Sequence, residues 1–158
     1  MIDLPSVLKL IHLLGATVLF GTGLGIAFFM WMAVRSGDPK VIAQVAGIVV
    51  VADMVFTATA VAVQPMSGAA LAWSMGFSLL EPWIIASIVV YVLVGACWLP
   101  VLGIQLRLRD LAVEAVSKNA PLSATFHRLF RIWFWLGWPA FLGVIVIFWF
   151  MIAKPSLW

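Results

Sequence analysis

Four long apolar segments constrain the fold of this chain more than any other feature of its sequence. They cover roughly residues 5–34, 41–65, 83–106 and 130–153. A helix needs about 20 residues to cross the hydrocarbon core of a bilayer, and each segment reaches that length. Because hydrocarbon offers no hydrogen-bond partner to bare backbone, each segment is predicted to be helical. The sequence therefore predicts an all-α membrane protein: one domain over 1–158, folded as a four-transmembrane-helix bundle.

The composition supports this class and excludes others. The chain is 65% hydrophobic and 9% charged, with a mean hydropathy of +1.19. Soluble domains are about half apolar and a quarter charged. We therefore expect the partner to be the lipid bilayer and not nucleic acid, despite the net charge of +3. The sequence contains no Walker loop, dinucleotide fingerprint, nucleophile elbow or HExxH motif, so hydrolase and nucleotide-driven functions have no support.

The basic residues predict an orientation. Seven of the nine Lys and Arg residues fall in the first and third connections, and only Lys9 and Lys154 lie toward the other side. The positive-inside rule then predicts an N-out, C-out protein of the bacterial inner (plasma) membrane. The third connection, 107–128, would be a cytoplasmic loop. It opens with an amphipathic stretch that should extend the third helix until Asn119 and Pro121 stop it.

Two ionisable side chains fall within the predicted spans, and His12 is the first. It lies about ten residues, or about 15 Å, outward from the centre of its span. A neutral imidazole nitrogen can ligate haem iron, and Lys9, one turn further out, could then meet a haem propionate. The alternative is a hydrogen bond between helices, with Gln64 at matching depth as the partner. The residues by themselves leave both interpretations open.

Asp53 is the second, close to the middle of its span, where an aspartate costs about 3 kcal/mol to insert. Helical spacing places Thr57 and Gln64 on the same stripe of that helix. This stripe could form a proton or ion path, or the lining of a cofactor pocket. Alternatively, Asp53 is a protonated acid that is hydrogen-bonded to a neighbouring helix, with Tyr91 or Trp98 of the third span as the donor.

The start of the first span resembles a known haem-binding group. Lys9-Leu10-Ile11-His12, followed by a glycine-containing apolar run to Gly25, is similar to the opening helix of bacterial four-helix membrane proteins of the HemJ and CopD type. In the HemJ family this histidine is linked to haem b, and the activity is protoporphyrinogen oxidation. The resemblance implies haem b at His12. It does not extend to the oxidation, because the HemJ pattern has a lysine in its third span and 83–106 contains none.

Other motifs resemble a second family. They are QPMSG at 64–68, EPW at 81–83, WLP at 98–100 before GIQLRLR, and FWLGWP at 134–139. Together they look like a family of predicted bacterial integral membrane proteins of unknown function. This resemblance spans most of the chain and implies the fold without an activity.

Three functions remain in competition, and whether the protein is an enzyme stays open. The leading hypothesis is a b-haem-binding protein with a redox or electron-transfer role, in which His12 ligates iron, Lys9 and Gln64 hold the cofactor, and Asp53 and Thr57 line the pocket or conduct protons. The second is a non-catalytic accessory or assembly subunit, a homo-oligomer or part of a larger membrane complex, with these residues as polar contacts. The third is a small proton or ion carrier that uses the Asp53 stripe.

Overall fold

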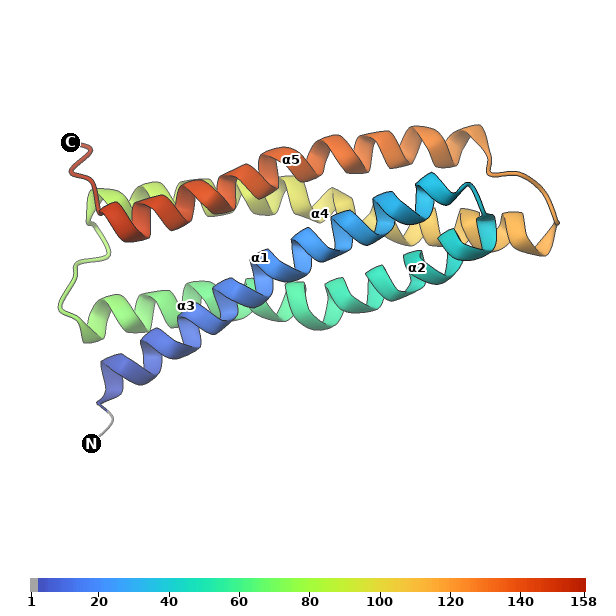
Figure 1. Cartoon of the computed structure of the whole chain (residues 1–158). Helices are drawn as coiled ribbons and strands as arrows, with labels where there is room; N and C mark the ends of the chain where they lie inside the picture. The colour runs from blue at the N-terminus through green and yellow to red at the C-terminus, as the bar shows by residue number, and fades with distance from the viewer. Residues whose placement is uncertain (1–2) are drawn as a thin grey trace.

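The structure, a computed structural model that describes residues 3–158, consists of four long helical rods. The rods are α1 (Leu4–Ser36), a composite of α2 (Pro39–Ala52), the π-helical turn η1 (Asp53–Thr57) and α3 (Ala58–Ser74), then α4 (Pro82–Ser117) and α5 (Ala124–Ala153). Figure 1 shows the rods running side by side, with both termini at one end of the bundle. Residues 3–158 contain no strand, and the prediction of an all-α four-helix membrane fold is confirmed.

The surface of the bundle is that of a protein solvated by lipid. In the most apolar stretch of each rod only 6% to 28% of the residues are buried within the protein. Large apolar side chains lie open along the rods, with Ile48 68%, Leu93 60% and Ile152 84% exposed. Leaving so much apolar surface in water would be unfavourable, so the bilayer must cover it.

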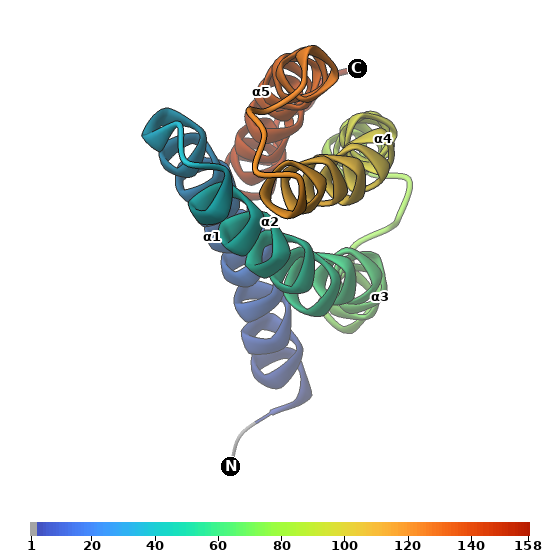
Figure 2. The same cartoon turned by 90° about the vertical axis from the view of Figure 1, so that its right-hand side faces the viewer.

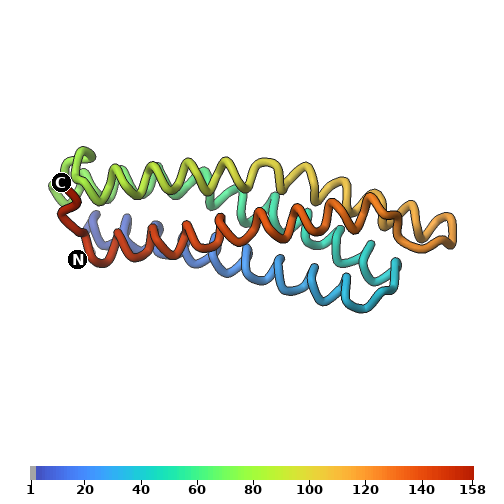
Figure 3. Tube along the Cα trace, turned by 90° about the horizontal axis from the view of Figure 1, so that it is seen from above, coloured from blue at the N-terminus to red at the C-terminus, as the bar shows by residue number. Residues whose placement is uncertain are grey.

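α4 continues beyond the third span, as the amphipathic stretch after Arg107 predicted, whereas α5 begins earlier than predicted. α4 continues to Ser117 because Leu108 and Ala112, both fully buried, keep it packed on the bundle. α5 begins at Ala124 and not near residue 130, because the Ser123 hydroxyl caps it by accepting from the Phe126 amide at 3.2 Å. Most of the predicted 107–128 loop is therefore helical, and the connection itself is short. Figure 3 shows this end of α4 and α5 reaching beyond α1 and α2.

The hairpin between α1 and α2 follows from its residue types. Gly37 takes a left-handed conformation (φ 70°) that ends α1. Asp38 then caps α2 by accepting from the Lys40 amide at 2.8 Å, and Pro39 occupies the first helical turn. We call this end of the bundle the basic end, and the opposite end the termini end. The basic end carries Arg35, Lys40, Arg107, Arg109, Lys118, Arg128 and Arg131.

The larger apolar core lies in the half of the bundle nearer the basic end, and a smaller cluster at the termini end buries Ala72, Trp83 and Ile84. The largest fully buried side chains of the larger core come one from each rod: Met30, Ile42, Leu108 and Phe126. Toward the termini end the packing changes to two pairs, α1 with α3 and α4 with α5. Within the described chain, α3 has no comparably close backbone contact with α4 or α5. Figures 1 and 2 show the two pairs diverging in this half.

A hydrogen bond between Tyr91 and Val61 joins the two pairs where they diverge. Pro65 lies inside α3 and has no N–H, so the carbonyl of Val61, four residues earlier, loses its helical partner. The Tyr91 hydroxyl of α4 donates to this carbonyl at 2.5 Å. Because the surrounding lipid cannot supply a donor, Tyr91 both satisfies the carbonyl and connects α4 to α3.

Replacing Tyr91 by Phe should therefore destabilise the bundle by about 1 kcal/mol, the range for a hydrogen bond between membrane helices. The effect should shrink in a Pro65→Ala background, because an alanine in place of the proline restores the N–H that the Val61 carbonyl lacks. Unfolding of all four variants in mixed micelles measures the coupling energy as a double-mutant cycle. Equal effects of Tyr91→Phe in both backgrounds would contradict this role.

Candidate functional site

His12 lies half-buried at the contact between α1 and α3. Its Nδ1 is 2.9 Å from the hydroxyl oxygen of Ser67, which is itself buried. Gly68 leaves the space that the ring occupies, since a Cβ there would lie 3.1 Å from the imidazole Cε1. Gln64 is the third α3 residue at the ring, so the structure brings His12 and Gln64 together at the depth that the sequence indicated.

The Gln64 amide also binds the backbone of α1. In the orientation that satisfies both partners, its nitrogen donates to the His12 carbonyl at 3.1 Å and its oxygen accepts from the Ala16 amide at 2.8 Å. The close approach requires Gly15, where a Cβ would lie 3.1 Å from the end of the Gln64 side chain. Gln64 thus connects α3 by two hydrogen bonds to one turn of α1.

The contacts at Nδ1 can serve either neutral form of the imidazole. The Ser67 hydroxyl donates to the Gln64 carbonyl at 3.2 Å, which leaves its oxygen free to accept a hydrogen from Nδ1. The Gln64 amide nitrogen, 3.0 Å from Nδ1, can instead donate to it. The first arrangement leaves a lone pair on Nε2, and the second leaves a hydrogen there. Within residues 3–158 Nε2 has no hydrogen-bond partner.

The two lysines nearest the termini end differ in their surroundings. Lys9 is exposed one turn before His12, and no acidic side chain of the described residues pairs with it. Lys154 lies over aromatic rings, with its Nζ 4.4 Å from the centre of Phe77 and 5.6 Å from that of Trp83. Of the two, Lys9 is the one available to an anionic group near His12.

Asp53 forms a second polar cluster near the middle of the bundle. Its side chain is 3% exposed, and Trp98 of α4 donates to its Oδ1 over 3.4 Å. Thr57 and Gln105 also face the carboxyl group, and both are buried. Among the described residues, Asp53 Oδ2 and Thr57 Oγ1 have no hydrogen-bond partner. Of the two donors proposed from sequence, Trp98 contacts Asp53, whereas Tyr91 binds Val61.

Asp53 and Thr57 begin and end the π-helical turn η1. The Ala58 amide bonds to the Asp53 carbonyl, five residues back instead of four. Such a turn changes the rotation of the helix at this point and is often found at functional sites. Both side chains lie buried on the inner face of the rod.

Gln105 is the residue that the sequence interpretation missed. It follows Trp98 by seven residues, as Trp98 follows Tyr91, so all three lie on one face of α4. The structure places this face against the second rod, where Tyr91 reaches Val61 and Trp98 reaches Asp53. The seven-residue spacing of polar and amphipathic side chains in an apolar helix is the signal that predicts Gln105.

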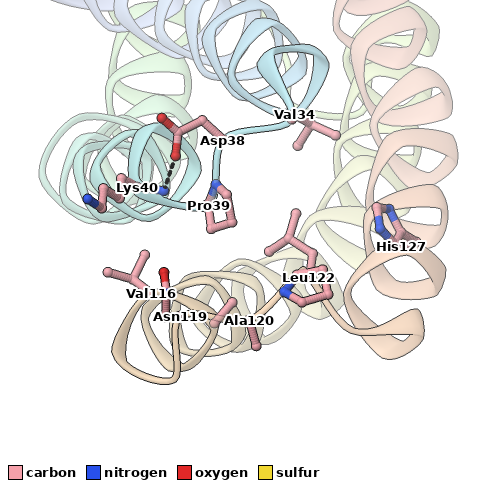
Figure 4. Close-up of a pocket in the computed structure, with 12 residues that line it drawn as sticks. Val34, Asp38, Pro39, Lys40, Val116, Asn119, Ala120, Leu122 and His127 are labelled. Carbon is pink, nitrogen blue, oxygen red and sulfur yellow. Dashed lines mark hydrogen bonds between the residues drawn. The ribbon is translucent and has the colours of Figure 1, made fainter.

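Neither cluster is a conventional metal centre, and neither lines the cavity at the basic end. Residues 3–158 hold no group of three or more His, Cys, Asp or Glu side chains suited to a metal ion. A cavity of about 450 Å³ opens at the basic end, between the two connections (Figure 4). Lys40, Asn119 and His127 are among its lining residues, and Asp38 there is already engaged as the cap of α2. This cavity is separate from His12 and Asp53.

Comparison with known proteins identifies the family. The profile of a family described as predicted integral membrane protein (DUF2269) matches residues 6–155. The chain belongs to this family. Nothing matched in the comparisons with curated proteins and with solved structures. The match includes both polar clusters and all four rods. The family description identifies an integral membrane protein and names no activity.

The space at Gly68 supplies a test of the His12 cluster. Gly68→Val should displace the imidazole and destabilise the α1–α3 pair by about 1–3 kcal/mol, the usual cost of overpacking. Gly21→Val is the matched control, because nothing lies within 4 Å of a Cβ at that position. Unfolding in mixed micelles compares the two. If both glycines tolerate valine equally, the ring does not pack against α3 as described.

Proposed function

We propose that this membrane protein binds haem b through His12 and serves in electron transfer. One observation carries the proposal: an imidazole inside the membrane can donate from Nδ1 to the Ser67 hydroxyl, while its Nε2 has no hydrogen-bond partner in the described chain. Histidine ligands of metals are commonly held in this way, with the second ring nitrogen bonded to the protein. An ionisable residue in a transmembrane helix is also a functional candidate in its own right.

The donor set fits a haem better than a bare metal ion. A bare ion needs three or four protein ligands, and no such cluster exists among residues 3–158. The porphyrin supplies four nitrogens of its own, so one axial imidazole is enough to attach it. When bound, haem supplies one-electron redox chemistry, with a potential that depends on the axial ligand and its hydrogen bonds.

Each residue of the cluster then has a distinct task. The Ser67 oxygen accepts the Nδ1 hydrogen, and the Ser67 hydroxyl donates to the Gln64 carbonyl. With its hydrogen on Nδ1, the imidazole keeps the Nε2 lone pair for iron. Gln64 keeps the α1 backbone beside α3. Lys9, exposed at the termini end, supplies a positive charge for a propionate. The weak packing of α3 against α4 and α5 leaves this half of the bundle the more adaptable one.

Absorption spectra of the purified protein, expressed with haem available, test the proposal. We expect a Soret band in the wild type that is lost in His12→Ala and kept in His127→Ala, since His127 is exposed at the basic end. Ser67→Ala should weaken haem binding by about 10- to 100-fold, the usual effect of removing a group that orients a ligand.

Two results would reject the assignment. One is a folded wild-type protein that stays colourless after haem is added. The other is a Soret band that survives in His12→Ala. A colourless protein that copurifies with a defined membrane complex would favour the accessory-subunit hypothesis, in which His12 and Gln64 only join helices.

The basic end is proposed to face the cytoplasm of a bacterium, with both termini outside the inner membrane. Cysteine accessibility tests this in a Cys97→Ala background, because Cys97 is the one cysteine of the chain. Ser156→Cys should react with a membrane-impermeant maleimide in intact spheroplasts. Ser117→Cys, at the basic end, should react only after permeabilisation. The reverse pattern would invert the orientation.

A further inference from the structure

The geometry at η1 points to a second site: we infer that Asp53 reversibly binds one proton in the middle of the bundle, with Thr57 and Gln105 as the neighbouring groups that can bond to either protonation state. This inference concerns a different cluster from His12, and it does not depend on haem. It assigns a role to Gln105 that the sequence motifs did not suggest.

Burial makes a permanent charge at this position costly. Asp53 is 3%, Thr57 6% and Gln105 5% exposed, and Asp53 Oδ2 and Thr57 Oγ1 have no partner in the described chain. An ionised carboxylate away from water is strongly unfavourable unless it is paired, and such groups neutralise instead. A proton on Oδ2 removes the charge and gives this atom a hydrogen to donate.

No charged group of the surrounding helices balances the carboxylate. On α1 the titratable group within the span is His12, which is engaged with Ser67 and Gln64. On α4 they are Tyr91, which donates to Val61, and Cys97 beside Trp98. The Lys, Arg, Asp and Glu side chains of α1, α2 and α4 lie toward the two ends of the bundle.

The neighbours of Asp53 are suited to both protonation states. A threonine hydroxyl and a glutamine amide can each donate or accept a hydrogen bond. They can therefore donate to the carboxylate, and after protonation Gln105 can turn its oxygen to accept from the acid. Trp98 only donates, and it does so to Oδ1. A lysine or arginine would hold the carboxylate ionised, whereas this set allows the proton to leave and return.

The packing indicates the end from which the proton arrives. Between Asp53 and the basic end lies the apolar core, with buried side chains from all four rods. Toward the termini end the same rod carries Thr57, Gln64 and Ser67, and the helix pairs diverge. Exchange with water is thus expected on the termini side. The step moves one proton between Oδ2 and water, and it needs no electron or co-reactant.

Infrared spectra of the protein in proteoliposomes, recorded over a range of pH, test this inference. We expect the carbonyl band of a protonated carboxylic acid that disappears reversibly at high pH and is absent from Asp53→Asn. Asp38→Asn is the control, since this exposed cap of α2 should leave the band unchanged. Circular dichroism and the elution volume confirm that each variant is folded.

The hydrogen-bond partners give a second readout, which a purely structural role would not move. Gln105→Leu and Trp98→Phe each remove a donor to the ionised form, so the midpoint of the band should move to higher pH by about one unit. Gln44→Leu and Trp138→Phe change the same residue types at exposed positions and should not move it.

Three results would overturn the inference. The wild type and Asp53→Asn could show the same carboxylic-acid bands at every pH, which would mean that the Asp53 carboxylate is permanently ionised. The band could persist at every pH at which the protein stays folded, which would mean a permanently protonated structural acid. Finally, replacing potassium by sodium could shift the midpoint, which would identify a metal-cation site instead of a proton site.

Discussion

The structure depends on one constraint, that hydrocarbon offers no hydrogen bond to a polar group. Each polar atom within the spans must therefore find its partner in another part of the protein. Tyr91 supplies a donor to the carbonyl that Pro65 releases, and Gln64 satisfies a carbonyl and an amide of α1. These bonds occur in the half of the bundle where the rods touch least. There they act beside the small apolar cluster of Ala72, Trp83 and Ile84 as specific connections between rods.

The two halves of the bundle consequently have different physical roles. Near the basic end, Met30, Ile42, Leu108 and Phe126 interlock in a dry core, which fixes the relative positions of the rods. Near the termini end the rods separate into two pairs, and the polar side chains lie between or along them. A rigid half that holds a more open half in register is a reasonable arrangement for a ligand or proton site, since the open half can adjust without loss of the fold.

The two polar clusters differ in how well their atoms are satisfied. In the His12 cluster the His12 carbonyl, the Ala16 amide and the ring nitrogen Nδ1 all have hydrogen-bond partners, and only Nε2 of the ring has none among the described residues. At Asp53 one carboxyl oxygen and the neighbouring hydroxyl have none. The imidazole, well oriented and with one free nitrogen, suits a permanently bound ligand. The carboxyl group has fewer hydrogen bonds and lies beside groups that can donate or accept, so it suits a reversibly bound species such as a proton. The structure therefore assigns different chemistry to residues that look alike in sequence, as isolated polar positions in apolar helices.

The sequence by itself determined the number of rods, their helical state and the position of each polar residue along its rod. Length and apolarity decide the first two, and a constant rise of 1.5 Å per residue decides the third, so His12 and Gln64 could be matched before any contact was known. Rotation about the helix axis and the spacing of neighbours are tertiary properties. The π-helical turn changes the rotation of the second rod at Asp53, which a regular helix would not predict. Only the packed bundle could therefore show that Gln105 faces Asp53, and that Tyr91 binds a backbone carbonyl instead of the carboxyl group.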